Sequence, residues 1–282
     1  MRGIALVVLA VALTVSVAAW AEGGAAPERP WLSPGKSVGD EIVGPDGGKL
    51  VWVPAGEFRM GAPAEDQRYA LGRLNGRREE FDGEQPIHRV RLSKGFWLGK
   101  CEVTNAQYRG YCKATKTEFP SASQQPDNHP VVRVSWDDAA TYCHHFGLVL
   151  PTEAQWEYAA RGPENRWYPW GNFWESGRCC YSHRQGPGGT TFPVGSFPQG
   201  ASWCGALDMA GNVWEFCQDW YDRLYYSDSP SQDPSGPSSG EYRVARGGGY
   251  GNPAANQRSA HRGINYPDDR DGDFGFRVCI TP

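Results

Sequence analysis

The sequence lacks three features: an excess of basic residues, a second long apolar run and an internal repeat. It carries 28 Lys and Arg against 32 Asp and Glu, whereas proteins that bind nucleic acid usually present a basic face. Beyond residue 21, no stretch supplies the roughly 20 apolar residues that a helix needs to span a bilayer. We therefore expect no nucleic-acid partner, no stable membrane anchor, and one monomeric domain that no linker divides.

Cysteine is also missing from part of the chain. Eight cysteines are present, yet none lies between Trp220 and Val278, and no C-x-x-C or His-x-x-x-His spacing indicates a redox or zinc motif. The stretch at residues 243–263, "RVARGGGYGNPAANQRSAHRG", falls in the cysteine-free part. Its three consecutive glycines precede two arginines that flank a histidine, a composition suited to presenting polar groups to a ligand.

The first residues have the pattern of a secretory signal peptide. Arg2 precedes an apolar run and a small-x-small cleavage site at Ala19-Trp20-Ala21. We predict a signal peptide at residues 1–21, an exposed leader rich in Pro and Gly at 22–46, and a periplasmic or secreted location. No cysteine follows the cleavage site, so a lipid anchor is not expected. In an exported chain, eight cysteines indicate disulfides.

Local patterns predict regular structure mainly in the first half of the chain. Apolar alternation in "KLVWVPAGEFRMG", residues 49–61, predicts strands around a turn. Thr104, Ser135 and Thr152 each stand three residues before a side chain that can complete a capping box, which predicts three helices. Residues 162–282 show little periodicity but many aromatics, and disordered segments are poor in aromatics. This part should form a compact, loop-rich body.

Several segments resemble, in order, the signature segments of the formylglycine-generating enzyme (sulfatase-modifying factor) family. They are "VSWDDAATYCHHFGLVLPTEAQWEYAARG", "YPWGN", "DMAGNVWEFCQDWY", "RGGGY", "RSAHR" and "GFRVC". The resemblance runs from about Lys49 to Cys279. It implies a single α+β domain over residues 47–282 that is loop-rich, has little regular secondary structure, and is related to C-type-lectin-like folds.

The "DMAGNVWEF" segment is a calcium site in that family. Carried over residue by residue, the resemblance implies Asp208 and Glu215 as side-chain ligands, with Gly211 and Val213 giving backbone carbonyls. Calcium takes such oxygen ligands together. From the residues alone, a capped turn with a hydrogen-bonded, buried Glu is the alternative. The family's second calcium site is not expected, because Cys180 stands where its Asn ligand should be.

The family also implies a disulfide between Cys143 and Cys279. The pairing of the other cysteines stays open, although adjacent Cys179 and Cys180 more often bond to two different partners than to each other. These other cysteines are Cys101, Cys112, Cys179, Cys180, Cys204 and Cys217.

Active members of the family bind copper(I) through two cysteines five residues apart, shortly after "GGSY". Here Asn252 and Gln257 stand near those positions, and an amide cannot replace a thiolate for copper(I). We therefore do not expect copper or the oxidation of cysteine to formylglycine, and no catalytic residue can be assigned. What remains is a predicted ligand-binding cleft, in which the arginines alternatively pair with nearby acids and only hold the loop. Its residues are Trp214, Tyr250, Asn252, Asn256, Arg258, His261 and Arg262.

Two functions of different classes follow. The first is a calcium-stabilised binding or maturation factor for an unknown peptide, protein or small-molecule ligand, as in family branches that lack the cysteine pair. The second is an oxidoreductase that generates formylglycine, or performs another oxidation, with a different metal or with displaced thiols. Cys204 and Cys217, around the expected calcium loop, are the candidates for such a displaced pair.

Overall fold

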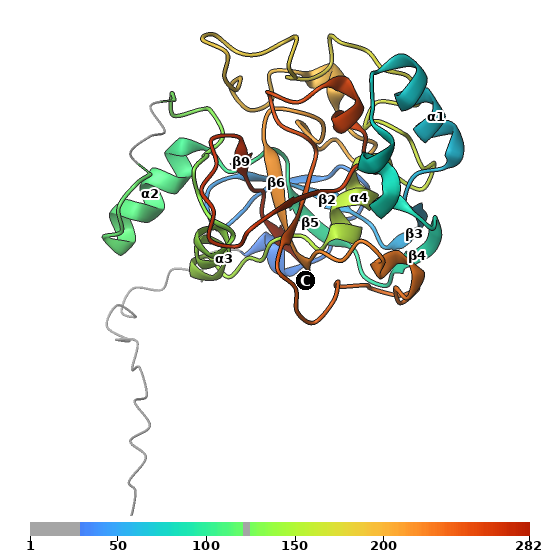
Figure 1. Cartoon of the computed structure of the whole chain (residues 1–282). Coiled ribbons are helices and arrows are strands. Elements are labelled where there is room, and N and C mark those ends of the chain that lie inside the picture. The colour runs from blue at the N-terminus through green and yellow to red at the C-terminus, as the bar shows by residue number, and fades with distance from the viewer. Residues whose placement is uncertain (1–28, 121–124) are drawn as a thin grey trace, which may run out of the picture.

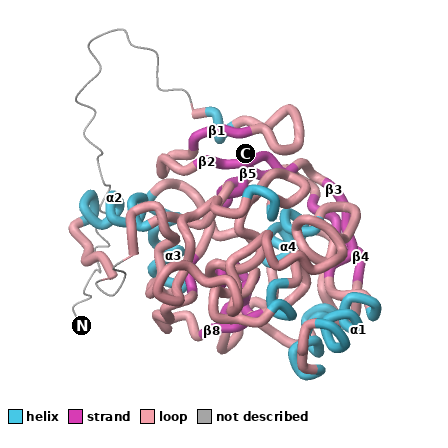
Figure 2. The backbone as a smooth tube through the Cα atoms, turned by 90° about the horizontal axis from the view of Figure 1, so that it is seen from above, coloured by secondary structure: helices cyan, strands magenta, loops and turns pink. Residues whose placement is uncertain are grey.

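The computed structural model of the protein describes residues 29–120 and 125–282 (Figure 1). The signal peptide predicted at residues 1–21 and the first part of the leader lie outside the described residues. Three small sheets, four α-helices and five short 3-10 helices form the regular structure of the described part. Loops make up much of the chain between these elements (Figure 2), and they predominate after Arg161. The prediction of one loop-rich α+β domain is confirmed.

The first sheet joins the beginning of the described chain to its C-terminal end. Strand β2 has both faces buried, because Leu50 and Trp52 pack in one hydrophobic cluster, and Val51 and Val53 pack in another. We call these the first and the second cluster. The sheet thus lies between the two main cores. Its antiparallel strands follow the order β1 (Glu41–Val43), β2 (Lys49–Val53), β5 (Phe96–Gly99), β10 (Cys279–Ile280).

The other two sheets flank this centre. In the two-stranded sheet, Phe58 and Met60 alternate with exposed residues and reach the second cluster, so the strands predicted around a turn at 49–61 are confirmed. In the third sheet, all pairs are antiparallel except β6 with β9. The two-stranded sheet contains β3 (Gly56–Met60) and β4 (His88–Leu92), and the third follows the order β8 (Gly263–Asn265), β7 (Arg243–Arg246), β6 (Trp214–Trp220), β9 (Phe274–Gly275).

Three helices begin at the predicted residues. Thr104, Ser135 and Thr152 are the N-caps, and each forms a complete capping box with the side chain three residues later. Helix α1 was not predicted: Pro63 precedes it, and its first turn has no side-chain cap. In the described part, no helix is long and apolar enough to cross a membrane. The helices are α1 (Ala64–Arg73), α2 (Asn105–Thr115), α3 (Trp136–His145) and α4 (Glu153–Arg161).

Helix α4 differs from the others because it is buried nearly all round. Only Gln155 among its nine residues is not buried. Trp156 and Tyr158 fill the second cluster, whereas Glu153, Glu157 and Arg161 follow one another at four-residue spacing and therefore lie on one side of the helix. Burial of three charged side chains requires partners of opposite charge.

Regular structure begins earlier than the sequence predicts. The short helix η1 (Pro30–Leu32) and strand β1 lie within the expected leader, and β1 pairs with β2. The turn between them is fixed by Asp46, whose carboxylate accepts hydrogen bonds from Gln107 Nε2 at 3.0 Å and from the Tyr142 hydroxyl at 3.1 Å. This contact of a single aspartate with α2 and α3 has no local signature in the sequence.

Candidate functional site

The glycine loop, which we define as residues 247–257, follows β7. Gly247 and Gly248 have positive φ angles of 95° and 76°, a conformation that favours glycine. A Cβ atom on Gly248 would lie 2.6 Å from Gln257 Oε1, so the loop folds back tightly on itself. The Tyr250 N–H donates to the Asn212 carbonyl at 2.8 Å, which ties the loop to the segment leading into β6.

Asn252 and Gln257, near the positions where the resemblance expects cysteines, both bind other groups of the protein. Asn252 Oδ1 accepts hydrogen bonds from Trp214 Nε1 at 2.8 Å and from Gly249 N at 2.9 Å. Gln257 is fully buried, and its Nε2 donates to the carbonyls of Gly249 and Asn252, at 3.3 Å each. The two amides therefore hold the loop in its folded shape.

Arg258 and His261 meet two buried acids from the segment that contains α1. Arg258 donates to both oxygens of Glu84, at 2.6 and 2.9 Å, and to Asp66 Oδ2 at 3.1 Å. His261 Nδ1 lies 3.2 Å from Glu84 Oε1, and its Nε2 lies 3.1 Å from Asn256 Nδ2. Burial raises the pKa of Asp66 to about 6. Burial also acts to raise the pKa of Glu84, but Arg258 and His261 together outweigh it and the pKa is lowered.

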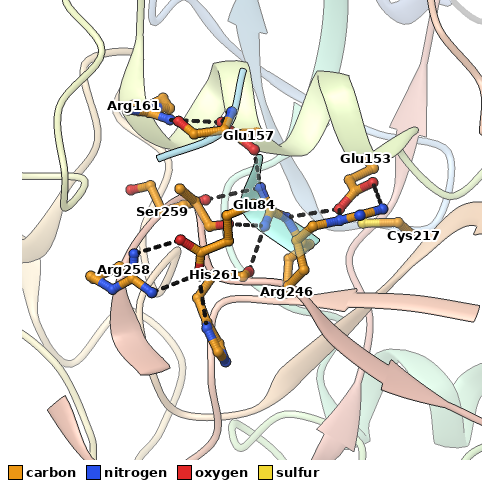
Figure 3. A network of polar contacts seen from close by, with 12 residues as sticks. Glu84, Glu153, Glu157, Arg161, Cys217, Arg246, Arg258, Ser259 and His261 are labelled. Atoms are coloured by element: carbon orange, nitrogen blue, oxygen red, sulfur yellow. Dashed lines mark hydrogen bonds and ion pairs between the residues drawn. The ribbon is translucent and has the colours of Figure 1, made fainter. Parts of the chain in front are cut away.

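Arg262 belongs to a second buried chain of charges that runs along α4. It donates to both oxygens of Glu153, at 2.7 and 2.9 Å. Arg246 lies between Glu153 and Glu157, and Glu157 Oε1 accepts from Arg161 at 2.7 Å (Figure 3). The acids and arginines alternate, so each buried charge has an opposite neighbour. This is the partner set that the buried face of α4 requires.

The seven predicted cleft residues thus fall into two groups. Trp214, His261 and both arginines are buried, and the arginines bind carboxylates, the arrangement expected if they hold the loop. The carboxylates are glutamates and one aspartate from distant segments, which local reading of the sequence did not find. Tyr250, Asn252 and Asn256 are only half-buried. Asn256 Oδ1 is buried and its Nδ2 contacts His261, so the polar side chains that the loop leaves accessible are those of Tyr250 and Asn252.

Two cavities of the described part lie away from the glycine loop. One of about 490 Å³ is lined by β3, β4 and Asn165. Another of about 440 Å³ is lined by Tyr108, Phe119, Arg133 and Arg270, among others. Residues of the glycine loop contribute to neither.

In the expected calcium segment, Glu215 is fully occupied by protein partners. Its two oxygens accept from Arg277 Nε at 2.5 Å and Nη2 at 2.6 Å, and Oε2 also accepts from Trp156 Nε1 at 2.7 Å. Asp208 has a positive φ of 57°, and its Oδ2 accepts from Gly195 N at 2.6 Å. Of the two acids predicted as calcium ligands, Glu215 is therefore paired with an arginine, whereas Asp208 accepts from a backbone amide.

A third acid, Glu102, lies beside Asp208 and was missed in the sequence. Burial, and then the charge of Asp208, raise the pKa of Glu102 well above its usual value. Within residues 29–120 and 125–282, no group of three or more His, Cys, Asp or Glu side chains is arranged to hold a metal ion. An ion here would need backbone carbonyls as well, as the resemblance implies for Gly211 and Val213.

Comparisons with known proteins agree with this architecture. The model of the sulfatase-modifying factor enzyme 1-like domain matches residues 41–282. The formylglycine-generating enzyme of Streptomyces coelicolor is 35% identical, over 81% of this chain and 88% of that protein. The mouse formylglycine-generating enzyme is 32% identical, over 82% of this chain and 74% of that protein.

A solved structure agrees as well. PvdO from Pseudomonas aeruginosa superposes with a TM-score of 0.73 and 28% identity, over 88% of this chain and all of that chain. The family match covers both clusters, the expected calcium segment and the glycine loop. The chain belongs to the sulfatase-modifying factor (formylglycine-generating enzyme) family.

Proposed function

We propose that the protein is an exported, calcium-stabilised binding or maturation factor that does not oxidise cysteine with copper. The proposal rests on the residue type and the hydrogen bonds of Asn252 and Gln257. Both are amides near the expected thiolate positions, and both bind groups of the protein: Asn252 accepts from Trp214 and Gly249, and Gln257 donates within the loop. Copper(I) prefers soft sulfur ligands, and the glycine loop contains none.

The displaced-thiol alternative finds little support in the surroundings of the cysteines. Cys204 and Cys217 are buried in the second cluster, and burial raises the pKa of each thiol. Cys180 belongs to a segment that touches the loop, because Ser182 N donates to the Asn252 carbonyl at 3.0 Å. Burial raises the pKa of the Cys180 thiol to about 12. A buried thiol disfavours the thiolate form that binds copper.

The accessible part of the loop indicates the chemistry of a ligand. The Tyr250 hydroxyl can both donate and accept hydrogen bonds, and Asn252, whose Oδ1 is used within the protein, keeps its amide nitrogen as a donor. The nearby arginines are neutralised by acids, so they do not select for an anion. We propose that the ligand is uncharged where it meets the loop, as the backbone of a peptide would be.

Calcium belongs to this proposal as a stabilising ion. The chain's own groups that would receive it are Asp208 and the carbonyls of Gly211 and Val213, with Glu215 nearby. A bound ion would offset the buried negative charge of this segment. It would supply structural support and no redox chemistry.

Two assays on the purified mature protein test the absence of copper chemistry. We expect no stoichiometric copper(I) and no formylglycine in a cysteine-containing sulfatase-type peptide incubated with copper and oxygen. The double variant Asn252→Cys, Gln257→Cys serves as the matched positive control and should gain copper(I) binding. Conversion of the peptide by the wild type would overturn the proposal in favour of the oxidoreductase.

A further inference from the structure

The two-stranded sheet has one covered edge and one open edge. It lies at the periphery of the molecule, on the side away from α2 and α3 (Figure 1). At the β4 edge, Arg91 N donates to the Ser231 carbonyl at 2.8 Å, and Asp233 N donates to the Arg91 carbonyl at 2.9 Å. No strand of the described part pairs with the other edge, which belongs to β3. Strand β3 therefore keeps backbone groups that a further strand could bind.

The register of the sheet identifies these backbone groups. In an antiparallel pair, residues alternate between bonding the partner strand and facing away from it. Arg59 N donates to Asn165 Oδ1 at 2.7 Å, and Gly61 N donates to Glu157 Oε1 at 2.8 Å, so the odd-numbered residues face away from β4. Glu57 is one of them, and its N–H and carbonyl have no partner among the described residues. Asn165 already occupies a position that a carbonyl of an added strand would take.

The cavity of about 490 Å³ lies beside this edge. Three consecutive residues of each strand line it, and Pro163 and Asn165 form the remaining wall. Asn165 thus borders both the cavity and the edge. A chain added along β3 would run beside the cavity and could place alternate side chains in it.

The charge of this face favours acidic side chains. Arg59 lies directly opposite Arg89 in a pair that is not hydrogen-bonded, where facing side chains come closest, and like charges placed in this way destabilise a sheet. Glu57 neutralises only Arg89, whose Nε donates to Glu57 Oε2 at 2.9 Å. Arg59 is exposed, and its guanidinium has no partner among the described residues. A carboxylate beside Arg59 would offset the repulsion.

We propose that the open edge of β3 binds an extended segment of a partner protein, which adds as a further strand and places an acidic side chain against Arg59. Main-chain hydrogen bonds to Glu57 would hold the segment, and Arg59 would select for the acid. Two copies of this chain would repel each other at this edge, because each face carries two arginines and one glutamate. The inference goes beyond the proposed function, since no residue of the glycine loop takes part.

Binding of two labelled peptides to the purified mature protein tests the inference. In one peptide Glu and Val alternate, and in the other Lys and Val alternate. We expect only the Glu–Val peptide to bind, more weakly as the salt concentration rises, and to slow amide hydrogen exchange in β3. Arg59→Gln should weaken binding by about 10-fold, whereas Arg109→Gln, at another exposed arginine, should leave it unchanged. No binding of the Glu–Val peptide, or equal binding of both peptides, would overturn the inference.

Two substitutions of Glu57 test the backbone contact. Glu57→Pro and Glu57→Ala both remove the carboxylate, but only Glu57→Pro removes the N–H. Because this N–H faces away from β4, its loss spares the strand pairing, and thermal unfolding checks that the fold persists. We expect Glu57→Ala to retain peptide binding and Glu57→Pro to lose it.

Equal affinities of these two variants would contradict the added strand. A wild-type dimer that Glu57→Pro dissociates would replace the partner segment by a second copy of the chain and would also overturn the inference. The copper and formylglycine assays concern the glycine loop, so failure of the proposed function and failure of this inference are distinguishable.

Discussion

At the scale of single residues, the protein buries an uncommon number of arginine side chains. Arg161, Arg246, Arg258 and Arg277 have no exposed surface, although arginine is rarely buried unless it is paired. Each meets a glutamate or an aspartate, and all four also donate to backbone carbonyls. An unpaired buried charge costs far more than a surface ion pair contributes, so these residues fix where distant segments meet.

Arg258 offers a direct test of this role. Arg258→Met leaves Asp66 and Glu84 buried without their cation, and we expect a loss of about 3–5 kcal/mol in the free energy of unfolding. Chemical denaturation measures it. Arg89→Met, which breaks the exposed contact with Glu57, is the control and should change stability by about 1 kcal/mol or less. Equal effects of the two substitutions would contradict a structural role for Arg258.

The buried carboxyl group of Asp219 should make the free energy of unfolding depend on pH. Burial, and then the charge of Glu153, raise the pKa of Asp219 from 3.8 to about 8. The folded protein therefore holds this proton more tightly than the unfolded chain does. The stability that the proton contributes is present at acidic pH and lost as the pH rises from about 4 to about 8.

Asp219→Asn keeps an acceptor for the Glu153 N–H, which bonds Asp219 Oδ2 at 2.8 Å, and removes the titration. Relative to the wild type, the variant should gain stability with rising pH, by at most about 1.4 kcal/mol per unit. Denaturation curves at pH 5 and pH 8 measure the gain. The exposed Asp228→Asn should show no such trend, and a pH-independent difference for Asp219→Asn would refute the prediction.

Among residues, sequence reasoning identified Asn252 and Gln257 but not the partners of the arginines. The two amides were found because a motif fixes their positions within a few residues of the glycines. Asp66 and Glu84 lie 192 and 174 residues from Arg258, and nothing local marks either as its partner. Glu102 lies 110 residues from Asn212, which donates to it, and no local signal marks that contact either.

At the level of elements, capping determines where three helices begin. Thr152 Oγ1 accepts from Gln155 N at 3.2 Å, and Gln155 Oε1 accepts from Thr152 N at 2.9 Å. Because α4 carries the buried acids, the position of its first turn also positions Glu153. Caps were predictable since their partners are three residues apart, whereas strands β6–β9 pair over long separations and gave no periodic signal.

Thr152→Ala should therefore cost about 1 kcal/mol of stability, measured by denaturant unfolding. Thr152→Ser retains the hydroxyl and should recover most of the loss. If Thr152→Ser is as unstable as Thr152→Ala, the methyl group rather than the cap is responsible.

For the whole molecule, the disulfide predicted between Cys143 and Cys279 has still to be tested. All eight are free thiols in the structure. Cys143 and Cys279 are brought close where Val149 N donates to the Cys279 carbonyl and Leu148 N to the Cys143 carbonyl. Burial raises the pKa of Cys143, and the neighbouring Cys279 adds to this. The disulfide implied by the family remains a prediction.

Mass spectrometry of protein made in an oxidising compartment should recover the Cys143–Cys279 peptide pair. A bridge closing so long a loop contributes about 4–5 kcal/mol in the chain-entropy model, so Cys143→Ser should lower stability by up to this amount. The loss should disappear when both proteins are measured under reducing conditions. An unchanged stability of Cys143→Ser under oxidising conditions would exclude the bridge.

The pairing of β10 with β5 has a consequence for the speed of folding. Strand β5 acquires its second neighbour only when Cys279 and Ile280 arrive, and Arg277 must be present before Glu215 can be neutralised. Both clusters include residues of the last described segment, such as Phe276 in the first and Cys279 in the second. Neither core is therefore closed until contacts across most of the described chain have formed, a topology that slows folding.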